Sequence, residues 1–252
     1  MKFLTAIPVY NEERHVEEVL QEVRRYSPNI LVVNDGSSDR TGELLGKQAD
    51  IDVIRHARNQ GYGAALISAF AYALRQDIDV LVTMDCDGQH EPARIPVLLE
   101  AIHDADIVSG SRYLRDFRQD TVAPQDRQHI NALVTQELNQ RFELNLTDAF
   151  CGFKAYRRCA LSKLRITETS WGMPLQLWVQ AARLGLRVKE VGVPRVYLDP
   201  SRAFGGVLNN AEERLAYYRR VIDEADRDFQ AVRARCDESL CSSDMLPEGP
   251  SL

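Results

Sequence analysis

The first 110 residues alternate between short apolar, β-branched runs and longer amphipathic stretches, and this order restricts the fold more than any other feature of the chain. The short runs predict strands, and the stretches between them repeat apolar residues at helical spacing. Strands that are apolar on both faces and separated by helices form a mainly parallel sheet covered on both sides. The predicted strands span residues 2–8, 30–34, 51–55, 80–85 and 106–110, and the predicted helices span residues 12–26, 41–48, 64–76 and 95–103.

The pattern changes after residue 110. A charged loop over residues 113–126 precedes a predicted helix over 127–142. Two further strands are predicted over 152–158 and 187–198, with a helix over 173–184 between them. The second of these strands contains glycine and proline, which predicts a place at the edge of the sheet.

The C-terminal part carries apolar residues at alternating steps of three and four on an otherwise charged stretch. This spacing predicts an amphipathic helix over 206–236 that folds back on its own domain. A homodimer formed through the same seam is the alternative. The seam consists of Leu208, Ala211, Leu215, Tyr218, Ile222, Ala225, Phe229 and Val232, and we expect residues 237–252 to form a disordered tail.

Charge and cysteine content exclude several classes of protein. The chain has 31 Lys and Arg against 37 Asp and Glu, so its net charge of -6 provides no broad basic surface for nucleic acid. Five scattered cysteines without a C-x-x-C pair argue against a disulfide framework and a zinc knuckle, and fit a reducing cytoplasm. The first residues do not resemble a signal peptide, and no apolar stretch approaches about 18 residues. We expect a cytoplasmic protein, with peripheral contact at the cytoplasmic membrane face as an open alternative.

Two acids directly follow an apolar strand in "MDCDGQH", residues 84–90. Ligands bind at the carboxyl ends of strands in such sheets, so Asp85, Asp87 and the Gln89 amide are expected to meet there. Few protein ligands with hard oxygen donors suit Mg²⁺ or Mn²⁺. A calcium loop of the EF-hand kind fits poorly, because Gly88 and Pro96 occupy the wrong positions. Acids that merely cap the next turn remain the alternative.

Two more segments follow neighbouring strands. In "VVNDGSSDRT", residues 32–41, the Asp35 carboxylate could accept hydrogen bonds from a ring N–H or from hydroxyls, or could belong to an ordinary turn. In "RHARNQGYGAA", residues 55–65, Gly61 and Gly63 begin a helix whose N–H groups could meet a phosphate, although a flexible helix start is equally compatible. In order, the segments describe a nucleoside pocket, a diphosphate approach and a divalent metal.

Six segments together resemble one family: "IPVYNEE" (7–13), "VVNDGSSDRT" (32–41), "RNQGYGAA" (58–65), "MDCDGQH" (84–90), "GSRY" (110–113) and "DAFCGFKAYRR" (148–158). The chain resembles a family 2 glycosyltransferase with a GT-A fold, most closely the dolichol-phosphate mannose synthase branch. The resemblance implies a GT-A domain over 1–205, a Rossmann-like, mainly parallel α/β sheet flanked by helices. Its nucleotide-sugar-binding half would be 1–110 and its acceptor half 111–205.

The resemblance also implies roles for individual residues. The nucleotide sugar would contact Pro8, Tyr10, Glu12, Asp35, Arg58, Gly61, Gly63 and Asp85. Asp85, Asp87 and Gln89 would hold Mg²⁺ or Mn²⁺. The phosphate of the acceptor would contact Arg112, Arg127, Asn131 and Arg202, although Asn131 stands where the family usually has a serine.

The implied reaction is metal-dependent, inverting transfer of mannose or glucose from GDP-mannose or UDP-glucose to a polyprenyl phosphate. A phosphomonoester with a second pKa of about 6 is already ionised, so oriented arginines suffice without a strong base. A sugar hydroxyl as acceptor would instead need a carboxylate to remove its proton, and Asp148 is the candidate, with a turn cap as its alternative. The residues expected to carry catalysis are Asp87, Arg112, Arg127 and Asp148.

Two further hypotheses come from other classes of protein. The chain could be a catalytically weak, nucleotide-sugar-binding partner of another enzyme. Nucleotidyl transfer to a sugar phosphate is disfavoured, because the chain lacks an N-terminal glycine-rich basic loop.

Overall fold

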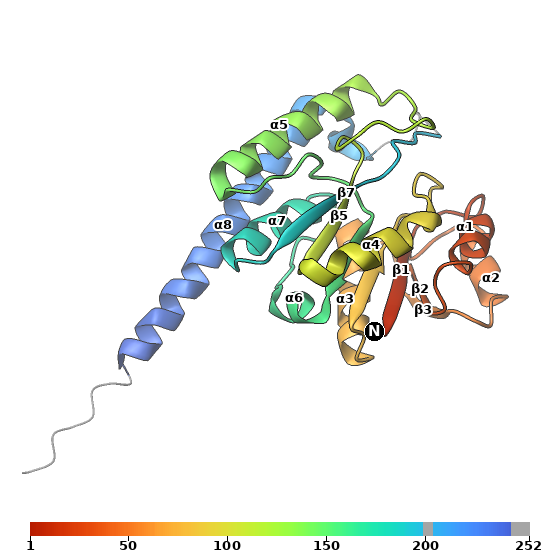
Figure 1. The fold of residues 1–252 in the computed structure, drawn as a ribbon, viewed down its shortest axis with the longest axis horizontal. Helices are drawn as coiled ribbons and strands as arrows, with labels where there is room; N and C mark the ends of the chain where they lie inside the picture. Colours follow the sequence, from red (N-terminus) through yellow and green to blue (C-terminus); the bar gives the residue numbers. More distant parts are fainter. Residues whose placement is uncertain (199–203, 243–252) are drawn as a thin grey trace, which may run out of the picture.

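The computed structural model describes residues 1–198 and 204–242, with side chains up to residue 234. Its centre is a seven-stranded sheet in the order β3-β2-β1-β4-β6-β5-β7 (Figure 1). Strand β6 runs antiparallel to both of its neighbours, and the other pairs are parallel. The strands are β1 (Phe3–Val9), β2 (Ile30–Asn34), β3 (Asp52–Arg55), β4 (Val80–Thr83), β5 (Ile107–Ser111), β6 (Lys154–Arg157) and β7 (Val188–Gly192).

The predicted strands are confirmed, but several are shorter than predicted. Strand β6 has four residues instead of the predicted seven. Strand β4 ends at Thr83, so Asp85 lies in the loop rather than on the strand. Strand β7 has five residues instead of the predicted twelve. Pro194 has no N–H with which to continue the ladder. The predicted edge position of β7 is confirmed.

Eight α-helices and three short 3₁₀ turns connect the strands in the described part of the chain. The α-helices are α1 (Val16–Val23), α2 (Thr41–Gly46), α3 (Tyr62–Arg75), α4 (Ile95–Ala101), α5 (Gln125–Phe142), α6 (Arg158–Lys163), α7 (Met173–Arg183) and α8 (Ala211–Ser242). The 3₁₀ turns are η1 (Pro92–Arg94), η2 (Ile102–Asp104) and η3 (Gly206–Asn209). Helix α6 was not predicted, and α1 begins four residues later than expected, after a turn in which Asn11 has a left-handed φ of 56°.

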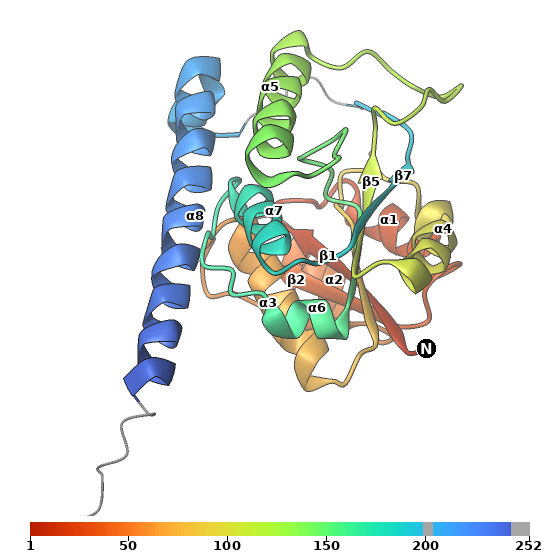
Figure 2. The same cartoon turned by 60° about the vertical axis from the view of Figure 1, so that its left-hand side comes forward.

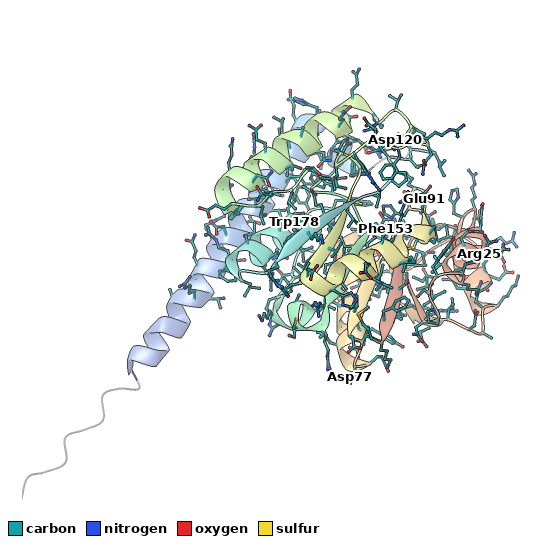
Figure 3. The ribbon with its side chains drawn as sticks, in the orientation of Figure 1. Arg25, Asp77, Glu91, Asp120, Phe153 and Trp178 are labelled. Atoms are coloured by element: carbon teal, nitrogen blue, oxygen red, sulfur yellow. The ribbon has the colours of Figure 1, made fainter. Side chains whose placement is uncertain are left out.

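The two faces of the sheet carry separate apolar clusters. Alternate residues of β1 point to opposite faces, so Leu4 joins one cluster and Ile7 the other. Helices α3, α5, α6, α7 and α8 cover the first face, and α1, α2 and α4 cover the second. In Figure 3, Trp178 of the first cluster and Phe153 of the second lie within the body of the domain. The predicted α/β fold, with a sheet covered on both sides, is confirmed.

Helix α8 stands along one side of the domain, beside α5 and α7 (Figure 2). Tyr218, Ile222 and Ala225 of the predicted seam are buried, which confirms that the helix folds back on its own domain. The alternative was a homodimer formed through the same seam. Packing against the domain covers the middle of that seam. Near the other end, Val232 is 53% exposed, and the last turns of α8 project beyond the body (Figure 1).

The boundaries of α8 differ from the prediction. Residues 206–209 form η3, and α8 begins at Ala211 and continues to Ser242. Residues 237–242, predicted as disordered, are therefore helical, because the charged sequence before Ser242 contains no helix-breaking proline or glycine. The rest of the predicted tail, 243–252, lies outside the described residues.

Candidate active site

A cavity of about 790 Å³ opens at the carboxyl ends of the central strands. Strands β1 and β4 are neighbours, and the chain builds the sheet outward from them in opposite directions. The loops that follow them diverge, which is where open α/β sheets bind ligands. The wall combines three groups of residues from different parts of the chain. One follows β1 to β3, a second consists of Asp85, Asp87 and Gln89, and a third contains Arg112, Arg127, Asn131 and Arg214.

The acidic loop begins two residues after β4. The Asp85 Oδ1 atom accepts a hydrogen bond from the Tyr62 hydroxyl at 2.9 Å. The Asp85 N–H donates to His90 Nδ1 at 3.0 Å, so the His90 side chain holds the main chain of the loop at Asp85. The Asp87 Oδ1 atom accepts the Gln89 N–H at 3.0 Å, across a turn in which Gly88 has a φ of +74°. Asp87 therefore does cap a turn, as the alternative held, while it also lines the cavity.

The donors at this corner fit Mg²⁺ or Mn²⁺. Asp85, Asp87 and Gln89, which the sequence placed together, all line the cavity. Within residues 1–198 and 204–242, no three His, Cys, Asp or Glu side chains are grouped to hold a metal ion by themselves. Two carboxylates with phosphate and water oxygens are a usual set for Mg²⁺, which keeps several non-protein ligands. The arrangement is thus suited to a metal that arrives with a diphosphate.

Tyr62 is a site residue that the sequence reasoning missed. Its burial, together with the Asp85 carboxylate, raises the pKa of the phenol well above its ordinary value, so the hydroxyl remains a donor. Its ring stacks on Trp171 with centroids 5.2 Å apart and an angle of 13° between the planes. The signal was available, because Tyr62 lies between Gly61 and Gly63 of a segment already singled out.

Pro8, Tyr10, Glu12 and Asp35, which the resemblance assigned to the nucleotide sugar, all line the cavity. The Asp35 carboxylate accepts the N–H groups of Gln60 at 2.9 Å and Gly61 at 2.8 Å. A third contact joins Asp35 Oδ1 to His56 Nδ1 at 2.6 Å. Asp35 therefore fixes the loop before α3 in addition to lining the pocket, which sequence reasoning did not anticipate.

Two predicted nucleotide-binding residues lie outside the cavity wall. The main chain of Arg58 packs against Gly36, where an added Cβ would lie 2.3 Å from the Arg58 carbonyl carbon, and the Arg58 side chain is exposed. Gly63 is buried with its Cα against the Glu168 carbonyl, 2.3 Å from an ideal Cβ. Gly63 is required for close packing of α3 against the 165–172 segment. Gly61, with a φ of 106°, does line the cavity and precedes α3.

Arg112 and Asp148 form a bidentate ion pair at the third part of the wall. Arg112 Nε lies 2.7 Å from Asp148 Oδ2, and Nη2 lies 2.9 Å from Oδ1. Asp148 is fully buried and does not line the cavity. Burial acts to raise its pKa, but Arg112 outweighs this effect and keeps the pKa below its ordinary value. This placement does not suit a general base, because both carboxylate oxygens accept hydrogen bonds and Asp148 is not part of the cavity wall.

Arg127 and Asn131 both line the cavity, as predicted. The Asn131 amide donates to Asp148 Oδ1 at 2.9 Å, so Asn131 also supports the Arg112 pair. The Arg127 guanidinium lies 5.0 Å from the centroid of the Phe204 ring. Arg202 lies outside the described residues.

Several cavity residues come from the second half of the chain and were not predicted. They are Trp171, Tyr197, Phe204, Arg214 and Tyr218. Tyr197 accepts a hydrogen bond from Arg112 Nη1 at 3.3 Å. Tyr218 belongs to the predicted seam. The spacing of apolar residues in a helix does not indicate that one of them lines a cavity together with residues near the start of the chain.

Comparison with known proteins identifies the family of the chain. The sequence model of "Glycosyl transferase family 2" matches residues 5–165. The chain belongs to this family. The enzyme is 34% identical over 222 residues to undecaprenyl-phosphate mannosyltransferase of Micrococcus luteus, covering 84% of this chain and 91% of the relative. It is 33% identical over 203 residues to polyprenol monophosphomannose synthase of Mycolicibacterium smegmatis, covering 75% and 76%.

The fold of this glycosyltransferase is also that of a solved structure. Glucosyl-3-phosphoglycerate synthase from Mycobacterium tuberculosis, in complex with Mn²⁺, uridine-diphosphate and phosphoglyceric acid, superposes with a TM-score of 0.66. The match has 19% identity and covers 90% of this chain and 78% of that chain. The likeness identifies the GT-A fold expected from the sequence.

Replacing Gly152 with alanine should impair the transferase without unfolding it. An added Cβ would lie 2.4 Å from Asp85 Oδ2 and 2.7 Å from Oδ1, so the Asp85 carboxylate must move. A displacement of about 1 Å can lower a rate by about a hundredfold, and we expect a tenfold to hundredfold loss of sugar transfer at about unchanged melting temperature. The Mn²⁺ concentration for half-maximal activity should rise.

Gly42→Ala is the matched control for this prediction. Gly42 lies in α2, and its nearest neighbour to an added Cβ is Asn34 Nδ2 at 3.5 Å, an ordinary contact. This variant should retain full activity. Wild-type activity and an unchanged Mn²⁺ requirement in Gly152→Ala would show that Asp85 has no part in the reaction.

Proposed function

We propose that this glycosyltransferase moves mannose or glucose from GDP-mannose or UDP-glucose to the phosphate of a polyprenyl lipid, with inversion and with Mg²⁺ or Mn²⁺. The observation that carries the proposal is that Asp85 and Asp87 share one cavity with Arg112 and Arg127. A site for a diphosphate with its cation and a site for a second anion thus face the same space. The relatives from Micrococcus luteus and Mycolicibacterium smegmatis, named as transferases for undecaprenyl phosphate and polyprenol phosphate, support this acceptor class.

In the proposed reaction, an acceptor phosphate oxygen forms a bond to the anomeric carbon while the bond from that carbon to the diphosphate breaks. The electron pair leaves with the nucleoside diphosphate. When bound, Mg²⁺ or Mn²⁺ would supply electrostatic stabilisation of the charge that develops on this leaving group. Asp85 and Asp87 would provide its carboxylate ligands, and the Tyr62 hydroxyl donates to one oxygen of Asp85 at 2.9 Å.

The arginines replace a general base in this scheme. Arg112 is held in one orientation by two hydrogen bonds to Asp148 and one to Tyr197. Together with Arg127, it could bind the acceptor phosphate and offset its charge as it approaches a second anion. Transfer to a sugar hydroxyl would require a free carboxylate near the acceptor, and the burial of Asp148 disfavours that alternative. A catalytically weak binding partner is disfavoured by the intact pair of acids.

A lipid acceptor requires contact with a membrane surface. Every helix in the described ranges is too short or too polar to cross a bilayer. The loop between β5 and α5 exposes Leu114 at 45% and Val122 at 91%, and the same loop begins beside Arg112. We propose that this loop makes peripheral contact at the cytoplasmic membrane face.

A ligand-stabilisation screen followed by a transfer assay tests the function. GDP-mannose or UDP-glucose at about a hundred times its Kd should stabilise the folded enzyme by about 2.7 kcal/mol, and only with Mn²⁺ or Mg²⁺ present. The stabilising donor should then transfer labelled sugar to undecaprenyl phosphate but not to undecaprenol. Stabilisation by no donor, or transfer to undecaprenol at an equal rate, would contradict the proposal.

A further inference from the structure

Helix α8 forms part of the wall of the cavity. Arg214 and Tyr218 of α8 line the same space as Arg127 and Asn131 of α5. The Arg214 side chain is only 3% exposed, which is unusual for an arginine. A buried guanidinium is costly unless it is paired and hydrogen-bonded, so its contacts define its role.

Those contacts converge on the surroundings of Arg127. Arg214 Nη2 lies 2.6 Å from Asp126 Oδ2, and Asp126 immediately precedes Arg127 in the first turn of α5. Arg214 Nη1 donates to the Leu208 carbonyl at 2.8 Å. The Arg214 guanidinium lies 4.5 Å from the centroid of Phe204, the ring that Arg127 approaches to 5.0 Å. One side chain thus contacts both the chain neighbour and the aromatic partner of Arg127.

Phe204 is in turn connected to the acidic corner. Trp171 Nε1 donates to the Phe204 carbonyl at 3.1 Å, and the two rings meet edge to face at 5.6 Å. Trp171 stacks on Tyr62, whose hydroxyl donates to Asp85. The contacts around Arg127 and those around Asp85 are therefore parts of one continuous set.

We propose that Arg214 is a positioning residue for the acceptor phosphate, which holds Arg127 in place through Asp126 and Phe204. The inference rests on the proposed function in one respect, that Arg127 meets a phosphate. It makes α8 a component of the acceptor site. Lysine could still pair with Asp126, but it lacks the planar fork that reaches Asp126 and the Leu208 carbonyl together.

Arg214→Gln, Arg214→Lys and a matched control test the proposal. The control is Arg219→Gln, because Arg219 also joins α8 to α5, through Glu137 at 3.0 Å, but is 52% exposed and does not line the cavity. The probe is farnesyl phosphate, with binding measured by calorimetry, and donor binding is measured in parallel. Arg214→Gln should weaken farnesyl phosphate binding by about tenfold, or about 1.4 kcal/mol. Arg214→Lys should fall between Arg214→Gln and wild type, and Arg219→Gln should stay within about twofold of wild type.

In transfer assays, Arg214→Gln should raise the KM for undecaprenyl phosphate by a similar factor. Its kcat at saturating acceptor and its donor affinity should be nearly those of the wild type. If Arg214 only stabilised the packing of α8 on the domain, its substitution would not raise the KM for the acceptor while leaving kcat and donor affinity nearly unchanged. Phe204→Leu removes the shared ring without leaving a buried charge unpaired, and should weaken farnesyl phosphate binding in the same way if Arg214→Gln fails to fold.

The inference is overturned if Arg214→Gln and Arg219→Gln lose farnesyl phosphate binding equally, or if binding is unchanged in Arg214→Gln. If Arg214→Gln fails to fold, unchanged binding in Phe204→Leu overturns it. It is also overturned if the wild type does not bind farnesyl phosphate. Failure of the proposed reaction gives a different result. A wild type that binds farnesyl phosphate but transfers no sugar contradicts the reaction, while the binding series still decides the role of Arg214.

Discussion

Asp87→Asn should lower kcat for sugar transfer by about a thousandfold, the scale of loss when a group that stabilises transition-state charge is removed. The substitution keeps the shape of the side chain and an oxygen to accept the Gln89 N–H, which Asp87 accepts at 3.0 Å. The turn should therefore survive, and the melting temperature should change little. The lost negative charge, by contrast, directly weakens the hold on a divalent cation.

The measurement is kcat over a range of Mn²⁺ concentrations, with GDP-mannose and UDP-glucose as donors. Excess Mn²⁺ should recover part of the activity of Asp87→Asn if the defect lies in metal affinity. Asp116→Asn is the control, because it removes one carboxylate from an exposed position in the loop between β5 and α5. A rate within tenfold of wild type, or an unchanged Mn²⁺ dependence, would refute the role of Asp87.

The acidic corner could be predicted because its signals are local. An apolar run ending at Thr83 predicts a strand, and carboxylates directly after a strand of a parallel sheet must lie at its carboxyl edge. The same reasoning correctly placed Asp35, after β2, at the cavity, whereas Tyr10 was assigned by the resemblance. The resemblance then supplied the interpretation of these positions as a glycosyltransferase site, and the match to the family model confirms the family.

The features of the site that could not be predicted depend on packing between segments that are distant in the sequence. Strand β6 enters the sheet antiparallel between β4 and β5, which places Gly152 against Asp85, and no periodicity in the sequence indicates that insertion. Arg58 and Gly63 were assigned to the ligand by motif, but side-chain direction and close backbone packing place them elsewhere. Arg214 lies next to an apolar seam, where a charged residue is ordinarily solvated.

Asp148→Asn should destabilise the fold by about 3–5 kcal/mol at pH 7, because it leaves the Arg112 guanidinium, which is only 17% exposed, beside a neutral amide. The pH dependence follows from the direction of the pKa shift. The folded-state pKa of Asp148 is lowered, so its contribution is complete above the unfolded value of about 3.9 and is lost as the pH falls through the lower folded value. The variant should lack this acid-side loss of stability. Urea unfolding at several pH values measures both effects.

Arg112→Met combined with Asp148→Leu provides the control for a buried pair. Removing both charges should restore much of the stability lost in Asp148→Asn, since replacing a buried ion pair with apolar groups is often close to neutral. The double variant should nevertheless bind farnesyl phosphate poorly, because Arg112 is gone. The catalytic readout separates the two roles considered for Asp148. If Asp148 orients Arg112, acceptor binding falls in Asp148→Asn. A stable Asp148→Asn enzyme that binds acceptor normally but reacts slowly would instead support Asp148 as the general base.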